Sequence, residues 1–478
     1  MAERSRSLHA ELTREIRESP PGPKIGAFFD VDRTLLAGFS AVAFVREQLL
    51  SGRMGPSALA EMTLGALGWA LGRSGFSGFV TSATASYRGL AESALEEIGE
   101  AVFVKQLAAM VYPESRAIVR AHQERGHTVA IVSSALRYQV EPLARDLGIE
   151  HVLCTQLEVE DGVFTGRVMK PTCFGAGKAA AVRGLAASEV LQLDESFFYT
   201  DSSDDLPALE VVGHPRPLNP DERLVRTARE RAWPVRRFQS RGTPGLVDLL
   251  RTASVYGSLA PAALAGLAAG IANQSRRAGV NLFGSFWADF ALSLAGVQIE
   301  IEGEEHLWSH RPAVFLFNHQ SALDMPLMIK LVRRDMTGVG KAELRWNPLF
   351  GPLLWLAGAA FVDRSDTKKS IEALAPAVAA LKTGTSLLIA PEGTRTPTPR
   401  LARFKKGAFH IAMQAGVPVV PVVLRNTGDA LPKNGFVVRP ATIEVVVLPP
   451  IDTSRWTRAQ LDAEIEAIRA RYLEVLEG

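Results

Sequence analysis

The stretch Val314-Phe-Leu-Phe-Asn-His-Gln-Ser-Ala-Leu-Asp324 joins a short apolar run to the polar residues that follow it. The apolar run is typical of a buried strand, and His319 and Asp324 come after its end. An imidazole in this position can take a proton from a hydroxyl group, with a nearby carboxylate fixing its tautomer. The stretch therefore predicts catalytic roles for His319 and Asp324. Ser321 to Asp324 also fits a helix capping box, in which Asp324 would bind only backbone amides.

A second apolar run, Ser386 to Ala390, leads directly into Pro391-Glu-Gly-Thr-Arg395. Ligands of open α/β sheets bind where strands end, so this loop is a candidate binding site. The guanidinium group of Arg395 offers two parallel donors that suit a phosphate group. We expect this loop to form a composite site with the one after Phe317.

Four further motifs accompany these two loops: Lys341-Ala-Glu-Leu344 with Pro348 and Gly351, Phe361-Val-Asp-Arg364, Phe404-Lys-Lys-Gly407 and Val417-Pro-Val-Val-Pro-Val422. In this order the set resembles the glycerolipid acyltransferase family, and most closely the 1-acylglycerol-3-phosphate acyltransferases, over about residues 275 to 450. Ala390 stands where the family usually has a larger apolar residue.

The resemblance implies an acyl transfer that yields phosphatidic acid. His319 would be the general base for the glycerol hydroxyl, and Asp324 would be its partner. The implied substrate-binding residues are Lys341, Arg364, Glu392, Gly393, Thr394 and Arg395. The co-substrate would be acyl-CoA or an acyl carrier protein thioester. Another lysophospholipid or a glycolipid is the alternative acceptor.

The first half of the chain contains a similar arrangement of strand ends. The apolar run before Asp30-Val-Asp32 ends in two aspartates, which is costly for a buried strand unless a cation such as Mg²⁺ lies there. Two more predicted strands, His127 to Val132 and Ser196 to Thr200, end in Ser133 and in an aspartate cluster. Lys178 lies near the start of a helical stretch.

This ordered set resembles the haloacid dehalogenase superfamily of phosphatases, in the branch with phosphoserine phosphatase-like enzymes, over about residues 24 to 240. The resemblance implies that Asp30 is the nucleophile and that Asp32 is first an acid and then a base. It also implies phosphoryl contacts from Thr34 and Ser133 and charge balance from Lys178. The implied metal ligands for Mg²⁺ are Asp30, Asp32, Asp201 and Asp205. Arg33 departs from the glycine that is common at its position.

A chain of 478 residues is too long for one core, so two α/β domains are predicted. Its composition, 47% hydrophobic and 22% charged, excludes wholesale disorder. The N-terminal domain is expected to be Rossmann-like with a helical cap at about 41–110, and the C-terminal domain to be an α/β acyltransferase domain. The predicted segments are a flexible tail 1–23, a phosphatase domain 24–240, a linker 241–250, membrane-associating helices 251–297 and an acyltransferase domain 298–478. In an alternative, the N-terminal domain only binds phosphate or recruits the chain to a membrane.

The segment between the two domains is apolar. Thr252 to Ser275 carries no charge but consists largely of Ala and Gly, which gain little from lipid. Leu282 to Leu294 reads as an aromatic amphipathic helix. We expect this helical pair to dip into one leaflet rather than to span the bilayer. A soluble helical hairpin is the alternative.

Composition also bears on location and partners. Cys154 and Cys173 lack metal-ligand spacing and suit a reducing compartment. We therefore expect a peripheral or monotopic protein on the cytoplasmic face of the cell membrane. The net charge of +2 gives no indication of a nucleic-acid partner, and none is predicted.

Overall fold

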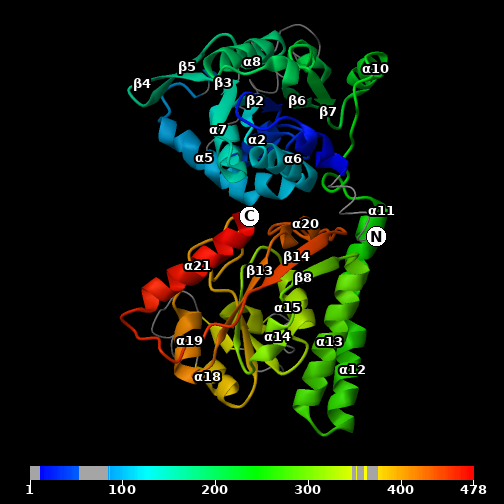
Figure 1. Ribbon diagram of the computed structural model, residues 1–478, viewed down its shortest axis with the longest axis vertical. Coiled ribbons are helices and arrows are strands. Elements are labelled where there is room, and N and C mark those ends of the chain that lie inside the picture. The colour runs from blue at the N-terminus through cyan, green and yellow to red at the C-terminus, as the bar shows by residue number, and fades with distance from the viewer. Residues whose placement is uncertain are drawn as a thin grey trace. The chain divides into compact units, whose positions relative to one another are not determined.

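The computed structural model describes residues 11–52, 84–85, 87–346, 351, 360–362 and 375–477. The chain divides into two compact units between Thr243 and Pro244, and each unit contains its own large sheet (Figure 1). The predicted α/β class is confirmed for both halves.

The N-terminal sheet has five parallel strands in the order β3-β2-β1-β6-β7. They are β1 (Gly26–Phe29), β2 (Thr128–Leu136), β3 (His151–Thr155), β6 (Phe197–Thr200) and β7 (His214–Pro217). β1 is buried along its whole length because both of its faces are covered, as in other parallel sheets. Since β1 lies between β2 and β6, the ends of these three strands share one edge.

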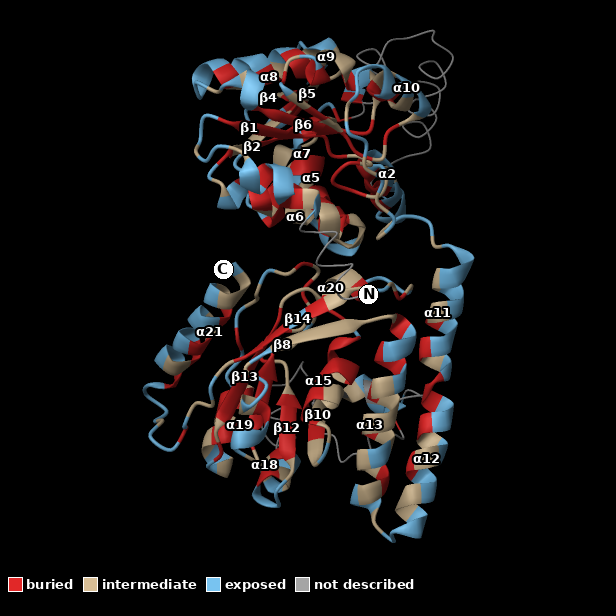
Figure 2. Ribbon diagram, turned by 45° about the vertical axis from the view of Figure 1, so that its right-hand side comes forward, coloured by how far each residue is buried: buried red, intermediate tan, exposed pale blue. Residues whose placement is uncertain are grey.

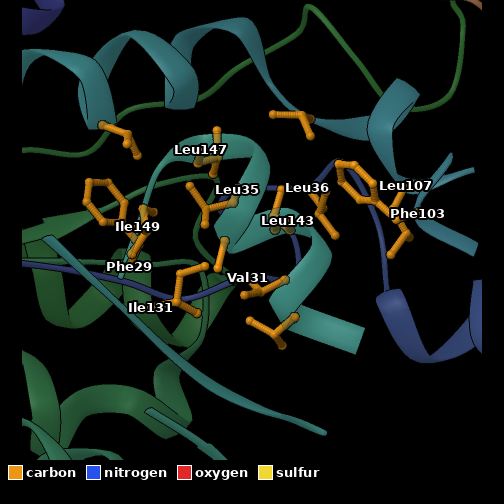
Figure 3. Packing of buried hydrophobic residues seen from close by; sticks show 14 of the residues in the cluster. Phe29, Val31, Leu35, Leu36, Phe103, Leu107, Ile131, Leu143, Leu147 and Ile149 are labelled. Atoms are coloured by element: carbon orange, nitrogen blue, oxygen red, sulfur yellow. The ribbon is translucent and has the colours of Figure 1, made fainter. Parts of the chain in front are cut away.

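Helices cover both faces of this sheet. Phe28 and Phe29 point to opposite faces, as successive residues of a strand must, and belong to different core clusters. One cluster includes α5 (Glu92–Lys105), α6 (Pro113–Glu124) and α7 (Arg137–Leu147), and part of it is shown in Figure 3. The other includes α8 (Ala176–Ser188), α9 (Leu206–Leu209) and α10 (Glu222–Glu230).

Several smaller elements complete the N-terminal unit: the hairpin of β4 (Leu157–Glu160) and β5 (Val163–Val168), and the short helices η2 (Leu193–Glu195) and η3 (Ser203–Asp205). Within the predicted helical cap, α2 (Ser40–Leu50), α5 and η1 (Leu107–Met110) are helical. Residues 53–83 and 86 of the cap lie outside the described residues.

The prediction of a flexible tail is wrong for residues 11–23. Residues 11–18 are helical, and Ile16 is buried in the N-terminal core. The chain after this helix is held by Arg125, whose side chain donates to the carbonyl oxygen of Ser19. The charged composition of this segment concealed one apolar residue that anchors it.

The C-terminal sheet has seven strands in the order β11-β10-β12-β9-β13-β14-β8. They are β8 (Gln298–Glu302), β9 (Val314–Phe317), β10 (Met336–Lys341), β11 (Ala360–Val362), β12 (Ser386–Ile389), β13 (Val419–Leu424) and β14 (Thr442–Val447). All neighbouring pairs are parallel except β13 and β14. β9 lies between β12 and β13, so the loops after β9 and β12 emerge side by side.

Helices also cover both faces of the C-terminal sheet. One core cluster includes α13 (Arg276–Ala295) and α15 (Asp324–Val332), and the other includes α18 (Ala375–Lys382), α19 (Gly407–Ala415) and α21 (Leu461–Glu477). Tyr472 ties α21 to the sheet, because its buried hydroxyl donates to the carbonyl oxygen of Leu316 at 2.7 Å and accepts from the amide of Val422 at 3.2 Å. Three short helices, α14 (His306–Ser309), η4 (Ala342–Trp346) and α20 (Thr427–Ala430), complete this unit.

Three helices precede the C-terminal sheet. α11 (Leu246–Gly257) begins inside the predicted linker 241–250, so the second half of that prediction is wrong. The side chain of Asp248 caps this helix by accepting a hydrogen bond from the amide of Gly245 at 3.2 Å. α12 (Leu259–Ala272) and α13 then form an antiparallel pair (Figure 1).

The contact between α12 and α13 is made by glycines. A Cβ atom on Gly279 would lie 2.7 Å from the carbonyl oxygen of Gly266 and 3.1 Å from Cα of Gly270. Leu264, Leu267 and Ile271 of α12 are 62 to 69% exposed, and α12 is largely unburied in Figure 2. By length and apolarity, Leu246–Ala272 is the one helical stretch in the described residues that could cross a membrane.

Three side chains under the N-terminal sheet form a buried hydrogen-bond chain. Nδ1 of His122 lies 2.8 Å from Nδ1 of His127, and Nε2 of His122 lies 2.9 Å from the hydroxyl of Tyr199. Nε2 of His127 lies 2.9 Å from the carbonyl oxygen of Pro20 and must donate to it. With both rings neutral, His122 donates to His127 and accepts from Tyr199. Burial is the main cause that lowers the pKa of His122 and of His127.

The buried hydrogen bonds among His127, His122 and Tyr199 predict that the N-terminal unit loses stability in mild acid. Because both folded-state pKa values lie below the ordinary value of about 6.5, the unfolded chain takes up protons first. The contribution of the two neutral histidines to the free energy of unfolding is complete above pH 6.5. It declines as pH falls, by up to about 1.4 kcal/mol per pH unit for each histidine. Urea unfolding of the N-terminal unit at pH 7.5, 6.5 and 5.5 measures this slope. We expect a flatter slope in His122→Gln, and an unchanged slope in that variant would contradict the assignment.

Candidate functional site

The ends of β1 and β6 are joined by one buried lysine. Nζ of Lys178 donates to Oδ1 of Asp30 at 2.7 Å and to Oδ2 of Asp205 at 2.8 Å. Oγ1 of Thr200 donates to the same oxygen of Asp205 at 2.6 Å. Lys178, Asp30 and Asp205 are buried, so the ammonium and its two carboxylates form a fixed charge network.

Burial and neighbouring charges shift the pKa values of this network. Burial alone would lower the pKa of Lys178, but Asp30 and Asp205 outweigh it, so the pKa rises and the ammonium stays protonated. Burial raises the pKa of Asp30 to about 7 against the opposing effect of Lys178. Burial, followed by the charge of Asp30, raises the pKa of Asp201 to about 8.

Asp32, Thr34 and Ser133 lie in the loop after β1 and within β2. Oδ1 of Asp32 accepts from the amide of Ser40 at 2.7 Å, and burial raises the pKa of Asp32, which suits a group that gives up a proton. The hydroxyl of Thr34 is buried and has no hydrogen-bond partner in the described part of the chain. Oγ of Ser133 accepts from the amide of Ala135 at 3.2 Å.

Arg33 occupies a backbone conformation that favours glycine, with φ of 58°. Its guanidinium group lies 3.2 Å from Oδ2 of Asp201. The backbone is held by Asn219, whose side chain donates to the carbonyl oxygen of Arg33 at 3.0 Å. Arg33 therefore keeps a backbone conformation that glycine reaches more easily, with Asn219 and Asp201 as its partners.

The structure does not bring the four predicted carboxylates together as one set of metal ligands. Asp205 is bound to Lys178 and Thr200, and the described residues contain no group of three His, Cys, Asp or Glu side chains suited to a metal. After burial, the charge of Asp30 is the next cause that raises the pKa of Asp201, so these two carboxylates lie close enough to repel each other. A divalent cation bound by these two carboxylates would remove that repulsion, and hard oxygen ligands suit Mg²⁺.

In the C-terminal unit, one carboxylate oxygen organises the loop after β9. Oδ2 of Asp324 accepts from Nδ1 of His319 at 2.7 Å and from the amides of Gln320 at 2.7 Å and Ser321 at 2.9 Å. Asp324 binds the imidazole as well as backbone amides, so the interpretation in which it binds only amides is wrong, and α15 begins at Asp324 itself without a side-chain cap. With its proton on Nδ1, His319 presents the lone pair of Nε2, and its side chain is 23% exposed.

The loop after β12 holds the backbone of His319. Oε1 of Glu392 accepts from the amide of His319 at 2.6 Å, and Oε2 accepts from the amide of Ala402 at 2.9 Å. The amide of Thr396 donates to the carbonyl oxygen of His319 at 2.8 Å. Both oxygens of Glu392 accept from backbone amides, so its side chain holds the loop that the resemblance assigns to phosphate recognition.

Of the other predicted substrate-binding residues, the structure describes Gly393, Thr394 and Arg395 in full, only the backbone of Lys341, and not Arg364. Gly393 has φ of 76°, Thr394 is exposed, and Arg395 is half-buried without an ion-pair partner in the described part of the chain. The backbone of Lys341 ends β10, and its side chain lies outside the described residues. Arg364 also lies outside them.

Sequence reasoning missed several residues of the two sites. Thr200 and Thr396 are ordinary strand and loop residues, and no sequence pattern marks their hydrogen bonds to Asp205 and His319. Arg33 was noted only as a departure from glycine. Lys405 belongs to a motif that the sequence shows, Phe404-Lys-Lys-Gly407, but the motif alone indicated no role for it.

Two family models match this chain. Residues 27–210 match the model described as haloacid dehalogenase-like hydrolase, and residues 298–425 match the model described as acyltransferase.

Curated relatives match each half separately. A 1-acyl-sn-glycerol-3-phosphate acyltransferase from Cocos nucifera is 40% identical over 41% of this chain, which spans 63% of that relative. One from Limnanthes alba is 38% identical over 41% of this chain and 69% of its own length. A probable phosphatase from Mycobacterium tuberculosis is 34% identical over 46% of this chain and 77% of its own length.

The two hydrogen bonds of Glu392 predict a measurable cost for Glu392→Gln. The substitution keeps the shape of the side chain but turns an NH₂ group toward one backbone amide, leaving that buried donor unpaired. We expect the C-terminal unit to lose about 1–3 kcal/mol of unfolding free energy. Urea unfolding measures this loss, and the exposed Glu466→Gln is the matched control. Equal stability of the two variants would contradict the arrangement.

Proposed function

Because the chain belongs to the haloacid dehalogenase-like hydrolases through its N-terminal half and to the acyltransferase family through its C-terminal half, we propose a two-activity enzyme of phospholipid synthesis. Its C-terminal site transfers an acyl group from acyl-CoA or an acyl carrier protein thioester to 1-acylglycerol 3-phosphate. Its N-terminal site hydrolyses a phosphomonoester with Mg²⁺.

The observation that carries this proposal is that each unit has its own charge network at its own strand ends. Lys178 joins Asp30 and Asp205 in one unit, and Asp324 orients His319 in the other. No residue of one network belongs to the other, so two independent reactions are the simplest use of the two sites.

Acyl transfer follows from the orientation of His319. Nε2 removes the proton of the glycerol hydroxyl while its oxygen attacks the thioester carbonyl carbon. The carbon–sulfur bond then breaks, and the imidazolium returns the proton to the leaving thiolate. Asp324 stabilises the imidazolium through the hydrogen bond at Nδ1, which measures 2.7 Å. The products are phosphatidic acid and a free thiol.

Phosphate hydrolysis follows from the placement of Asp30. Its carboxylate attacks phosphorus while Asp32 gives a proton to the departing alcohol, and an aspartyl phosphate forms. Asp32 then takes a proton from the water that attacks this intermediate and releases inorganic phosphate. Thr34 and Ser133 would donate to the phosphoryl oxygens, and Lys178 would balance the negative charge of those oxygens; the buried hydroxyl of Thr34, which has no partner in the described part of the chain, supports this role.

Mg²⁺ would be held by the carboxylates of Asp30 and Asp201, with the backbone carbonyl of Asp32 as the further oxygen ligand. When bound it supplies electrostatic stabilisation of the charge on the phosphoryl group. Asp205 acts on this site through Lys178 and not as a ligand.

The helices before the C-terminal sheet support binding to a membrane surface. The exposed apolar residues of α12, Leu264, Leu267 and Ile271, would enter the acyl region of one leaflet. One face of α13 packs on the protein, since Ala291 and Leu292 are buried in the core, while Leu282 and Phe290 are exposed and would dip into the leaflet with α12. We place the enzyme as a peripheral or monotopic protein on the cytoplasmic face of the cell membrane.

The two reactions are expected to be separable by single substitutions. His319→Ala should lower thiol release from acyl-CoA and lysophosphatidic acid by roughly 100- to 10,000-fold, because the general base is lost. It should leave phosphate release from phosphomonoesters unchanged. Asp30→Asn should abolish phosphate release and leave thiol release unchanged.

Thiol and phosphate release from the same purified variants measure both activities. If either substitution removed both activities from a folded protein, the two-site proposal would be wrong. If a broad panel of phosphomonoesters with Mg²⁺ gave no phosphate release at all, the N-terminal unit would bind phosphate rather than cleave it.

A further inference from the structure

Three segments of the C-terminal unit are bonded together beside His319. The segment 391–396 binds the backbone of His319 through Glu392 and Thr396. The segment 402–405 joins it, because Ala402 donates to Glu392 at 2.9 Å and the amide of Lys405 donates to the carbonyl oxygen of Pro391 at 2.8 Å. The backbone of Lys405 is therefore fixed to the same loop that fixes the catalytic histidine.

The side chain of Lys405 lies across Gly393. A Cβ atom built on Gly393 would be 3.0 Å from Cδ, from Cε and from Nζ of Lys405. Three consecutive atoms at this distance place the end of the lysine side chain flat over the glycine. Gly393 suits this loop by its φ of 76°, and its lack of a side chain leaves room for the lysine that lies over it.

The ammonium group of Lys405 has no acidic partner in the described part of the chain, and the side chain is exposed. Its neighbour Lys406 differs, because Nζ of Lys406 lies 2.7 Å from Oδ1 of Asp462. Phe404, the residue before Lys405, is buried and packs edge-on against Tyr472 with ring centroids 5.3 Å apart. A buried anchor and a fixed backbone hold a cation at the loop while leaving its charge unpaired.

We propose that Lys405 binds the phosphate group of the acyl acceptor. This assignment rests on the proposed acyl transfer and adds to it a specificity-determining residue outside the Pro391–Arg395 loop. Lys405 would bind the phosphate together with Arg395, which is also without an ion-pair partner among the described residues.

Charge explains why a second cation is needed at this loop. A phosphomonoester carries about −1.5 to −2 charges at pH 7, so one guanidinium group leaves part of this charge unbalanced. The carboxylate of Glu392 adds negative charge close by, and its oxygens are bound to backbone amides rather than to a cation. Lys405 supplies the remaining positive charge, and it favours a monoester over a lysophospholipid with a singly charged phosphodiester.

The experiment compares Lys405→Ala with the matched control Lys406→Ala in the full-length protein. With acyl-CoA at saturation, Lys405→Ala should raise KM for lysophosphatidic acid about 10- to 100-fold, the usual cost of a lost hydrogen bond to a charged group. It should change kcat little, because His319 keeps its hydrogen bonds. Lys405→Arg should recover part of the loss, and Lys406→Ala should match the unaltered protein.

The acyl donor also carries phosphates, so its KM is measured in the same variants. A rise in KM for acyl-CoA with an unchanged KM for lysophosphatidic acid would overturn the assignment and give Lys405 to the donor. An unchanged KM for both substrates would overturn it as well. If kcat fell while KM stayed constant, Lys405 would serve the arrangement of the loop and not the phosphate.

Equilibrium binding makes the test independent of turnover. Binding of short-chain lysophosphatidic acid is measured by calorimetry in an Asp30→Asn background with a chelator, which prevents hydrolysis at the N-terminal site. A rise in Kd of about 10- to 100-fold in Lys405→Ala, and none in Lys406→Ala, supports the assignment even if no acyl transfer is found. Equal Kd values would refute it, whereas a failure of acyl transfer alone would refute only the proposed function.

Discussion

The burial of the central strands on both faces constrains both sites. β1 and β9 are four residues long and buried throughout, because helices cover each side of their sheets. Polar groups can then appear only where these strands end, and parallel neighbours bring their own ends to the same edge. Asp30 and Asp201 therefore share one edge in the first unit, and His319 and Glu392 share one in the second.

The two units stabilise their buried acidic groups in different ways. The N-terminal site places one ammonium between two carboxylates, so removing Lys178 would leave both uncompensated. The C-terminal site has no such cation at Asp324 or Glu392 among the described contacts. Backbone amides donate to both oxygens of Glu392 and to Oδ2 of Asp324, and these hydrogen bonds also fix the loops to which the amides belong. In the N-terminal unit, the ammonium group keeps a positive charge between the two carboxylates. In the C-terminal unit, the backbone amides fix the conformation of a loop.

The sequence could predict which residues lie at strand ends but not what each would contact. The sequence identifies His319 and Asp324 because an apolar run stops before them. Glu392 lies close to them because β12, the strand before it, pairs in parallel with β9. Whether Glu392 faces a ligand or the backbone depends on the amides of His319 and Ala402, which are distant in sequence. The same holds for Asp205, which the resemblance assigns to a metal. Its partner Lys178 belongs to another element, so the sequence does not show that the two are bonded. In the helix at residues 11–18, Leu12 and Ile16 pack on the core, and two apolar residues four positions apart are too few to predict that a charged segment is held in place.

Arg33 shows how a departure from a family pattern can be accommodated. A non-glycine residue at φ of 58° costs on the order of 1 kcal/mol or more. The hydrogen bond from Asn219 to its carbonyl oxygen and the ion pair with Asp201 offset that cost. The replacement also changes the electrostatics of the site, because a glycine would bring no charge to Asp201. Arg33 lowers the pKa of Asp201 while burial and Asp30 raise it, so the arginine offsets part of the cost of burying this carboxylate in its ionised form.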